Sequence, residues 1–428
     1  MDNSTIALII IGVMMILYFT EILPIATTSV LACLSLAVFG VIPYREALGG
    51  FGNDIVFLIM GMVVVGDALF ETGVAALMGK KIISLVGTRE RVFIGALFIV
   101  IIPISAFLSN TATVAMMLPV ASSAIAASGG KLKKKDIFMI IGLISVVGGG
   151  LTLVGSTPQL IAQGLLIDGG HETIRFFELS YVGLPIILLL AVYLMTVGHS
   201  LKKKVFNFPE VEDNIAGAEA CNDEDLKKTP VQISRMFISV AVLVFCVFGF
   251  IFELWTLGTV AMVGAVICVV TGCITQKNVF LKMNWTTVVI IGCSFGIAAG
   301  LDHSGLGVMA AQGMVRLLGD SISPWLLCVA LSFVAVVFTN FMSSTATASL
   351  LVPIAAIAAT ELGYDVKSVV MSVAMATNIG YSTPVSTPPI TMTLAGGYRF
   401  MDYVKFGGLF NILAFLLLIA LLPIVTSI

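Results

Sequence analysis

Apolar runs of about 18 to 20 residues recur along this chain, and they limit its fold more than any other feature. Of its 428 residues 59% are hydrophobic and 11% are charged, whereas a soluble protein of this length carries about a quarter charged residues. Inside a bilayer every backbone polar group must be paired internally, so runs of this length predict helices. The first run, residues 6–18, has no basic flank and no small-residue cleavage site, which predicts a retained span rather than a signal peptide. The sequence therefore predicts an all-α polytopic membrane protein.

Two polar segments interrupt the apolar runs and share the pattern S-x-T-A-T-x5-P. The first covers residues 109–113 and continues to Pro119, and the second covers residues 343–347 and continues to Pro353. Hydroxyl and amide side chains are costly in a membrane unless they are buried in protein or line a cavity. A pair of such segments therefore indicates a functional site.

The motif pair belongs to a duplication of the whole chain. Ser109 lies 234 residues before Ser343, Gly73 lies 232 before Gly305, and Ser156 lies 230 before Ser386. We expect a first repeat at 1–200, a cytoplasmic linker at 201–233 and a second repeat at 234–428. The expected segments of the first repeat are spans at 5–20, 26–42, 54–78 and 180–198, a hairpin at 92–128 and a broken helix at 136–168. Those of the second are spans at 234–253, 257–274, 285–303 and 404–426, a hairpin at 324–360 and a broken helix at 367–396.

Basic residues set the expected topology. They flank segment 92–128 on both sides, which predicts that both of its ends lie in the cytoplasm. Its polar centre and short arms favour a re-entrant hairpin over two full spans. Both termini then lie outside, and most of the 22 basic residues lie inside. Each repeat has five spans, one of them broken, plus a hairpin, so the second repeat is predicted to be inverted.

Inverted repeats with interrupted helices are typical of secondary transporters, whose site lies near the midplane where the broken segments meet. That rule predicts a site built from residues 109–111, 155–158, 343–345 and 386–388. Half-helix N-termini suit an anion, and oxygens at the breaks suit Na⁺. No Lys or Arg lies in these four segments, so cations or dipoles would balance a bound anion. The alternative is that small residues only permit tight helix packing.

The motifs as a set resemble the divalent-anion:sodium symporter (DASS) family of dicarboxylate, citrate and sulfate carriers, within the ion-transporter superfamily. The likeness rests on Ser-Asn-Thr at a hairpin tip, on residues 155–159 after a Gly-rich break and on residues 384–389, and it covers nearly the whole chain. It implies a homodimer with an elevator-like mechanism, in which hairpins and broken helices slide against a scaffold of the remaining spans. The substrate-binding residues that it implies are Ser109, Asn110, Thr111, Ser156, Thr157, Ser343, Ser344, Thr345, Thr387 and Pro388. The Na⁺ sites that it implies are Ser105, Ser109, Asn110 and Gly155 for the first and Thr339, Met342, Ser344 and Ser386 for the second.

This sequence departs from the family pattern at its second motif. Ser344 stands where an amide side chain is usual, and a hydroxyl is shorter and lacks the NH₂ donors. Asn340, four residues earlier, would face the same way on a helix. Gln159 and Ile390 replace the Asn that often follows the proline pair. Because some members of the family are sodium-independent exchangers, coupling stays open between Na⁺ and counter-substrate.

The acids, histidines and basic residues contribute little to the predicted function. Asp67, Glu71 and Asp302 are candidates for proton coupling or, alternatively, interfacial acids. The three histidines are scattered and no nucleophile motif occurs, so we expect no enzyme, no metal centre and no cofactor besides Na⁺. No basic patch indicates nucleic acid. The expected function is secondary active transport of a small di- or tricarboxylate across the cytoplasmic membrane, with a sulfate-like oxyanion carrier or an ion antiporter as alternatives.

Overall fold

A computed structural model describes residues 2–74, 77, 89–128, 131–208, 230–309, 312–313 and 323–425 of the chain. Over these residues the regular structure is helical, without a strand. This confirms the expected all-α fold.

The first half of the chain runs from α1 to α11. Its elements are α1 (Asn3–Thr20), α2 (Ile25–Val38), α3 (Tyr44–Gly49), η1 (Gly50–Gly52), α4 (Asp54–Glu71), α6 (Glu90–Phe107), α7 (Asn110–Ala127), α8 (Lys134–Gly148), η2 (Gly149–Leu151), α9 (Thr157–Asp168), α10 (Ser180–Met195) and α11 (Val197–Val205).

The second half repeats this order from α12 to α21. Its elements are α12 (Pro230–Ile251), α13 (Leu257–Val270), α14 (Gln276–Lys282), α15 (Trp285–His303), α17 (Pro324–Phe341), α18 (Ser344–Glu361), α19 (Val366–Thr377), α20 (Pro388–Met392), η4 (Thr393–Gly396) and α21 (Phe400–Val425).

Backbone conformation repeats as well as element order. Glu21 and Glu253 are the non-glycine residues with positive φ in the described part of the chain, each at 49°, and they end α1 and α12. Gly40 and Gly272 follow α2 and α13 in the left-handed region, at φ 77° and 71°. Each pair lies 232 residues apart. Left-handed backbone is uncommon for a residue with a side chain, so its recurrence at one offset indicates a shared local fold.

The helices are those of a multi-pass membrane protein. Within the described residues, eight helices are long and apolar enough to cross a bilayer, or nine if the bent pair α10 and α11 counts as one span. α2 and α13 are shorter than the expected spans 26–42 and 257–274, with 14 residues each. Both end just before their left-handed glycines, which terminate the helix.

The expected linker, 201–233, is wrong at both of its ends. α10 bends by 57° into α11, which continues to Val205, and α12 already begins at Pro230. The helix persists through the basic run because Leu201 and Val205, four residues apart, pack against the core. Lys202 is 2% exposed and pairs with Glu90 at the start of α6. Residues 209–229, with the acidic run of the expected linker, lie outside the described residues.

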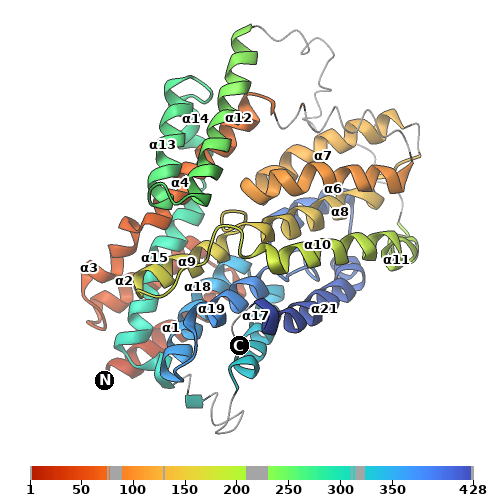
Figure 1. Cartoon of the computed structure of the whole chain (residues 1–428). Helices are drawn as coiled ribbons and strands as arrows, with labels where there is room; N and C mark the ends of the chain where they lie inside the picture. The colour runs from red at the N-terminus through yellow and green to blue at the C-terminus, as the bar shows by residue number, and fades with distance from the viewer. Residues whose placement is uncertain are drawn as a thin grey trace.

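The helices form two bundles that meet along a limited contact. The first bundle holds α1 to α4 and α12 to α15, and the second holds the hairpins, the broken segments, α10, α11 and α21. Figure 1 shows α12, α13 and α14 at the upper left, away from α7, α6 and α11 at the right. The bundles meet where α15 packs on α18 and where α9 packs on α4 and α15.

Two central helices, α8 and α19, organise the second bundle. Every residue of α19 is buried, and so is all of α8 from Ile137 onward. A helix that is enclosed on all sides belongs to the middle of a large apolar body. The second helix of each broken segment packs against helices of the other repeat. α9 packs on α18 and α19, and α20 packs on α7 and α8.

The two broken segments run antiparallel. Tyr398, just after η4, donates to the carbonyl of Lys135 at 2.8 Å and accepts from the backbone N–H of Met139 at 3.0 Å, in the first turns of α8. At the start of α19, Lys367 pairs at 2.8 Å with both Glu172 and Glu178 in the loop after α9. Each segment therefore begins beside the end of the other.

The hairpins α6–α7 and α17–α18 have longer arms than expected. Each arm is an 18-residue helix, which at 1.5 Å per residue is about 27 Å, close to the thickness of the hydrocarbon core. Pro103, Pro119 and Pro353 lie inside arms without ending them. The re-entrant hairpin stays a prediction that rests on the basic flanks.

We predict that Gly407→Ala destabilises the fold and that the adjacent Gly408→Ala does not. A Cβ on Gly407 of α21 would lie 1.8 Å from the carbonyl oxygen of Tyr381, whereas one on Gly408 would meet its first atom at 3.9 Å. Overpacking costs about 1–3 kcal/mol, and a backbone atom cannot rotate away. Thermal unfolding of the purified variants measures the difference, and an equal melting temperature for both would contradict the packing of α21 on this unwound segment.

Candidate functional site

The first hairpin tip gathers oxygens from two helix ends. Ser105, in the last turn of α6, donates to the side-chain Oδ1 of Asn110 at 2.5 Å and to the carbonyl of Ser145 at 2.7 Å. Ser145 lies in the last turn of α8, and its Oγ is 2.9 Å from Ser105 Oγ and donates to the carbonyl of Asn110 at 3.0 Å. Ser105 and Ser145 are fully buried. The cluster therefore joins the C-terminal ends of α6 and α8 to the start of α7.

Two glycines let the unwound segment after α8 reach this cluster. A Cβ on Gly149 would lie 2.5 Å from Asn110 Nδ2, 2.6 Å from its Oδ1 and 2.7 Å from the carbonyl oxygen of Gly155. A Cβ on Gly155 would lie 2.4 Å from the carbonyl of Gly149. Only glycine fits at both positions, and this brings the Gly155 carbonyl to the side of the Asn110 amide.

The second repeat builds a similar but distinct arrangement. Thr339, at the position of Ser105, donates to the carbonyl of Thr377 at 2.8 Å. The backbone N–H of Ser344, at the second tip, donates to the carbonyl of Ser386 at 2.9 Å. Ser386 in turn donates to the carbonyls of Gly380 and, at 2.9 Å, Thr383. Met342 is fully buried beside them.

One brace is common to both repeats. Thr152 Oγ1 donates to the carbonyl of Ala106, and Thr383 Oγ1 donates to the carbonyl of Asn340 at 2.7 Å. Each bond fixes the end of a hairpin arm to the unwound segment of its own repeat. Both carbonyls lie in a last helical turn, where the helix itself supplies no partner.

Asn340 does not share a helix with Ser344, because it lies in the last turn of α17 whereas Ser344 begins α18. Its amide already has backbone partners in the unwound segment. Its Nδ2 donates to the carbonyls of Val336 at 2.7 Å and Ile379 at 3.4 Å, and its Oδ1 accepts from the N–H of Ser382 at 3.2 Å. The amide therefore braces the break, and it does not replace the missing amide of Ser344.

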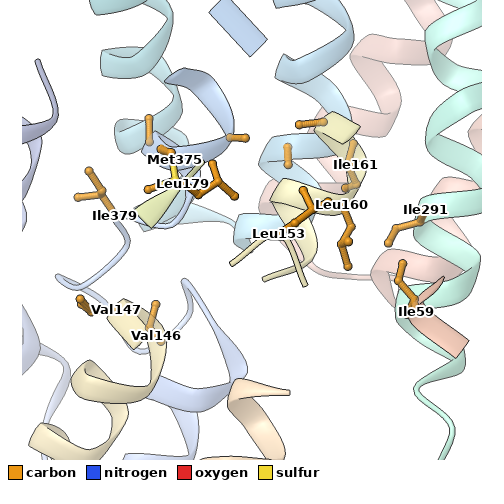
Figure 2. Close-up of a cluster of buried hydrophobic side chains, with 14 of the residues drawn as sticks. Ile59, Val146, Val147, Leu153, Leu160, Ile161, Leu179, Ile291, Met375 and Ile379 are labelled. Atoms are coloured by element: carbon orange, nitrogen blue, oxygen red, sulfur yellow. The ribbon is translucent and has the colours of Figure 1, made fainter. Parts of the chain in front are cut away.

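Polar contacts also join the breaks of the two repeats. Ser156, just before α9, donates to Asn378 Oδ1 at the end of α19, at 2.5 Å. Gln159, in the first turn of α9, is fully buried against the thioether of Met375, at 3.9 Å. Figure 2 shows Leu160 and Ile161 of α9 between Met375 on one side and Ile59 and Ile291 on the other. The polar breaks thus lie within an apolar core.

The helix starts at the breaks differ in how they are capped. No side chain of the described residues caps α7 after Ser109 or α9 after Ser156. At the second tip, Ser343 accepts from the N–H of Ala346 at 3.2 Å and so caps α18. Uncapped N–H groups and the positive end of the helix dipole favour an anion. The first tip and α9 therefore offer more free donors than the second tip.

Eight of the expected site residues fall into three groups. Ser105, Asn110 and Gly155 come together at the first tip, and Thr339, Met342, Ser344 and Ser386 lie around the second. Ser156 lies between the repeats. Ser109 and Pro388 are exposed, Thr387 is buried, and Thr111, Thr157, Ser343 and Thr345 are half-buried.

The sequence missed Ser145, Thr152 and Asn378. Ser145 and Thr377 are 232 residues apart and Thr152 and Thr383 are 231 apart, so the offsets of the repeat pair them. That pairing is the signal that would have found the first two. Asn378 has no polar counterpart in the first repeat, and only its distance to Ser156 identifies it.

Of the acids considered for proton coupling, Glu71 pairs with two side chains of α14. Glu71 accepts from Asn278 at 2.7 Å and from Lys282 at 2.8 Å, at the end of α4. His303 lies 3.3 Å from Glu46, and both side chains are exposed. Over the described ranges, no group of three His, Cys, Asp or Glu residues is arranged to hold a metal ion.

Comparisons with known proteins match the sequence of this chain to transporters. A family model described as "Citrate transporter" (CitMHS) matches residues 6–369. The sodium-dependent dicarboxylate transporter SdcS of Staphylococcus saprophyticus is 26% identical, over 89% of this chain and 78% of its own length. SdcS of Staphylococcus aureus strain RF122 is 25% identical over the same shares of both chains.

Two further matches carry less information on function. An uncharacterized transporter of Haemophilus influenzae is 26% identical, over 96% of this chain and 89% of its own. The crystal structure of the YdaH transporter of Alcanivorax borkumensis aligns with a TM-score of 0.49 and 15% identity, over 91% and 87% of the two chains.

We predict that Thr152→Val and Thr383→Val each lower the stability of the second bundle by about 1–3 kcal/mol, because each leaves a buried carbonyl without its hydroxyl donor. Thr360→Val is the matched control, since that exposed hydroxyl bonds the carbonyl of Ala356 in its own helix. Thermal unfolding of the three variants tests the brace. If Thr383→Val lowers the melting temperature and Thr152→Val does not, the hydroxyl brace stabilises only the second repeat.

Proposed function

The chain belongs to the citrate transporter family, and on that premise we propose that it carries a small di- or tricarboxylate across the cytoplasmic membrane together with Na⁺. As a member of this family it is a membrane transporter and not an enzyme, as the sequence predicted. The match also confirms the resemblance to the DASS family.

The oxygen cluster at the first hairpin tip carries the proposal of a cation. Ser105, Ser145 and Asn110 bring hydroxyl, amide and carbonyl oxygens together, and the Gly155 carbonyl lies on the side of the Asn110 amide where Gly149 packs. Carbonyls at unwound segments and at half-helix C-termini coordinate Na⁺ in transporters of this design. The donor set is all oxygen and uncharged, which fits a hard monovalent cation. The printed names of the SdcS relatives, sodium-dependent dicarboxylate transporters, support this choice.

The anion is proposed to bind beside this cluster, at the starts of α7 and α9. Both helix starts lack a side-chain cap in the described structure, and the four break segments hold no Lys or Arg. A carboxylate there would receive backbone N–H groups and hydroxyls, and the bound cation would balance its charge. We assign it to Ser109, Asn110, Thr111, Ser156 and Thr157 from the first repeat. The remaining residues, from the second repeat, are Ser343, Ser344, Thr345, Thr387 and Pro388.

An elevator-like movement of the second bundle is part of the proposal. All four breaks lie in that bundle, and its contact with the first runs mainly through α15 on α18 and α9 on α4 and α15. The antiparallel course of the broken segments supports an inverted repeat. The homodimer and the placement of both termini outside remain predictions from the resemblance and from the basic residues.

Anion exchange without Na⁺ is the second candidate. It is favoured by the second tip, where Ser344 lacks an amide and the hydroxyls of Thr339 and Ser386 already bond carbonyls. An ion antiporter finds less support, because none of the four break segments contains an acidic residue. A sulfate-like oxyanion carrier would use the same anion site, and only the anion that is taken up distinguishes it from a carboxylate carrier.

We predict that the purified protein in liposomes takes up labelled succinate, citrate or 2-oxoglutarate only when an inward Na⁺ gradient is imposed. The parallel experiment replaces the gradient with unlabelled anion inside the liposomes and omits Na⁺. Uptake in that second condition alone would establish the exchanger. Uptake of sulfate and of none of the carboxylates would replace the carboxylate carrier with the oxyanion carrier.

We predict that Asn110→Ala reduces uptake to background while the protein still inserts and purifies normally. The substitution removes Oδ1 from the cluster and the amide beside Gly155. Asn278→Ala is the control, because that amide lies on α14 and donates to Glu71 at the end of α4, away from the breaks. Full uptake by Asn110→Ala would refute the site.

A further inference from the structure

We propose that Asn378 is a positioning residue that makes the carrier prefer a 2-hydroxy acid, such as malate or citrate, to the same acid without its hydroxyl group. Asn378 does so by holding the hydroxyl proton of Ser156, so that the Ser156 oxygen accepts a hydrogen bond from the substrate. The inference rests on the proposed carboxylate transport and adds to it a substrate class and a residue.

The contact between Ser156 and Asn378 fixes which of the two donates. Ser156 Oγ lies 2.5 Å from Asn378 Oδ1, an oxygen that can only accept. Asn378 Nδ2 donates to the carbonyl of Ala374 at 3.2 Å. If the amide were turned over, two acceptor oxygens would face each other there, so the amide keeps this orientation. The single proton of the Ser156 hydroxyl therefore points to Asn378.

A substrate carboxylate at Ser156 would have to withdraw this proton from Asn378. Asn378 is 5% exposed, and within the described part of the chain Ser156 is the donor that reaches its Oδ1. A buried acceptor that loses its donor is costly. Ser156 is half-buried, and its oxygen keeps lone pairs that can accept. The substrate group that meets Ser156 is therefore a donor, and a hydroxyl is the donor that an ionised hydroxy acid carries.

The matching hydroxyl of the second repeat is not held in this way. Thr387 precedes α20 as Ser156 precedes α9, with φ and ψ of −149° and 140° against −145° and 141°. Thr387 Oγ1 is buried and has no hydrogen-bond partner among the described residues. Its proton is therefore free for a carboxylate. One break thus presents a hydroxyl that donates, and the other presents a hydroxyl that accepts.

A 2-hydroxy acid matches the chemistry of the first break. Its hydroxyl and one carboxylate are attached to the same carbon. The carboxylate can receive backbone N–H groups at the uncapped start of α9 while the hydroxyl donates to Ser156. The remaining carboxylate is assigned to the second repeat, with Thr387. An acid without the hydroxyl leaves the Ser156 oxygen without a donor, so it binds more weakly.

Two pairs of acids that each differ by one hydroxyl test the preference. The first pair is L-malate and succinate, and the second is citrate and tricarballylate. Melting temperatures of the purified protein are measured against rising concentrations of each acid at constant NaCl, because a ligand of the folded state raises the melting temperature. We expect half-maximal stabilisation at an about tenfold lower concentration of the hydroxy acid in at least one pair, as the loss of one hydrogen bond to substrate predicts.

Three variants separate positioning from packing. Asn378→Ala releases the Ser156 proton, and Ser156→Ala removes the acceptor, so we expect both to bring the ratio of the two concentrations close to one. Asn411→Ala is the matched control, because that buried amide accepts from the N–H of Tyr381 at 2.8 Å in the unwound segment after α19. It should lower the melting temperature without ligand and keep the wild-type ratio.

Three results would overturn the proposal. A wild-type ratio near one in both pairs would mean that no hydroxyl is recognised. If Asn378→Ala weakens both acids of a pair by the same factor, Asn378 serves packing alone. If Ser156→Ala loses the preference and Asn378→Ala keeps it, Ser156 recognises the hydroxyl without help from Asn378.

Failure of the proposed function gives a different result. If none of the four acids raises the melting temperature or is taken up into liposomes, carboxylate transport and this inference fail together. If the acids bind and are taken up without a preference for the hydroxyl, the carboxylate carrier stands and only the inference fails.

Discussion

The structure depends on satisfying backbone groups where helices break inside an apolar body. The ends of α6, α8, α17 and α19 leave carbonyls without helical partners, and the bilayer supplies no water to pair them. Hydroxyls from the neighbouring segment do so, as Thr339 does for Thr377 and Thr383 for Asn340. Because the side chains that pair these carbonyls also belong to the proposed site, we propose that stability and function depend on the same residues.

The two repeats meet this constraint in different ways. In the first, Gly149 and Gly155 bring backbone against the Asn110 amide, and two hydroxyls share one place. In the second, the amide lies at Asn340 and pairs with backbone, so the break is closed by its own bonds. A duplicated scaffold therefore places its side-chain amide differently at the two tips.

Packing between the repeats places the breaks in one body. α9 packs on α18 and α19, and α20 packs on α7 and α8, so neither broken segment completes its surroundings within its own repeat. Ser156 and Asn378 add a polar contact between residues 222 positions apart. The second bundle is thereby joined more closely within itself than to the first, which is what a body that moves as a unit requires.

The sequence by itself determined the helical class, the membrane setting, the duplication and the residues at the tips. These depend on run length, on small polar residues within apolar runs and on a fixed offset between the repeats. All three can be read along the chain without knowing which residues are in contact. The tertiary structure alone decided the roles of Ser145, Asn340 and Asn378, since their partners are set by packing and not by spacing. It also decided that the basic run after α10 is helical, because Leu201 and Val205 find an apolar surface that no local pattern reveals. Hydrogen bonds between distant segments form only where packing brings them together, and a motif fixes which residues are available but not which of them meet.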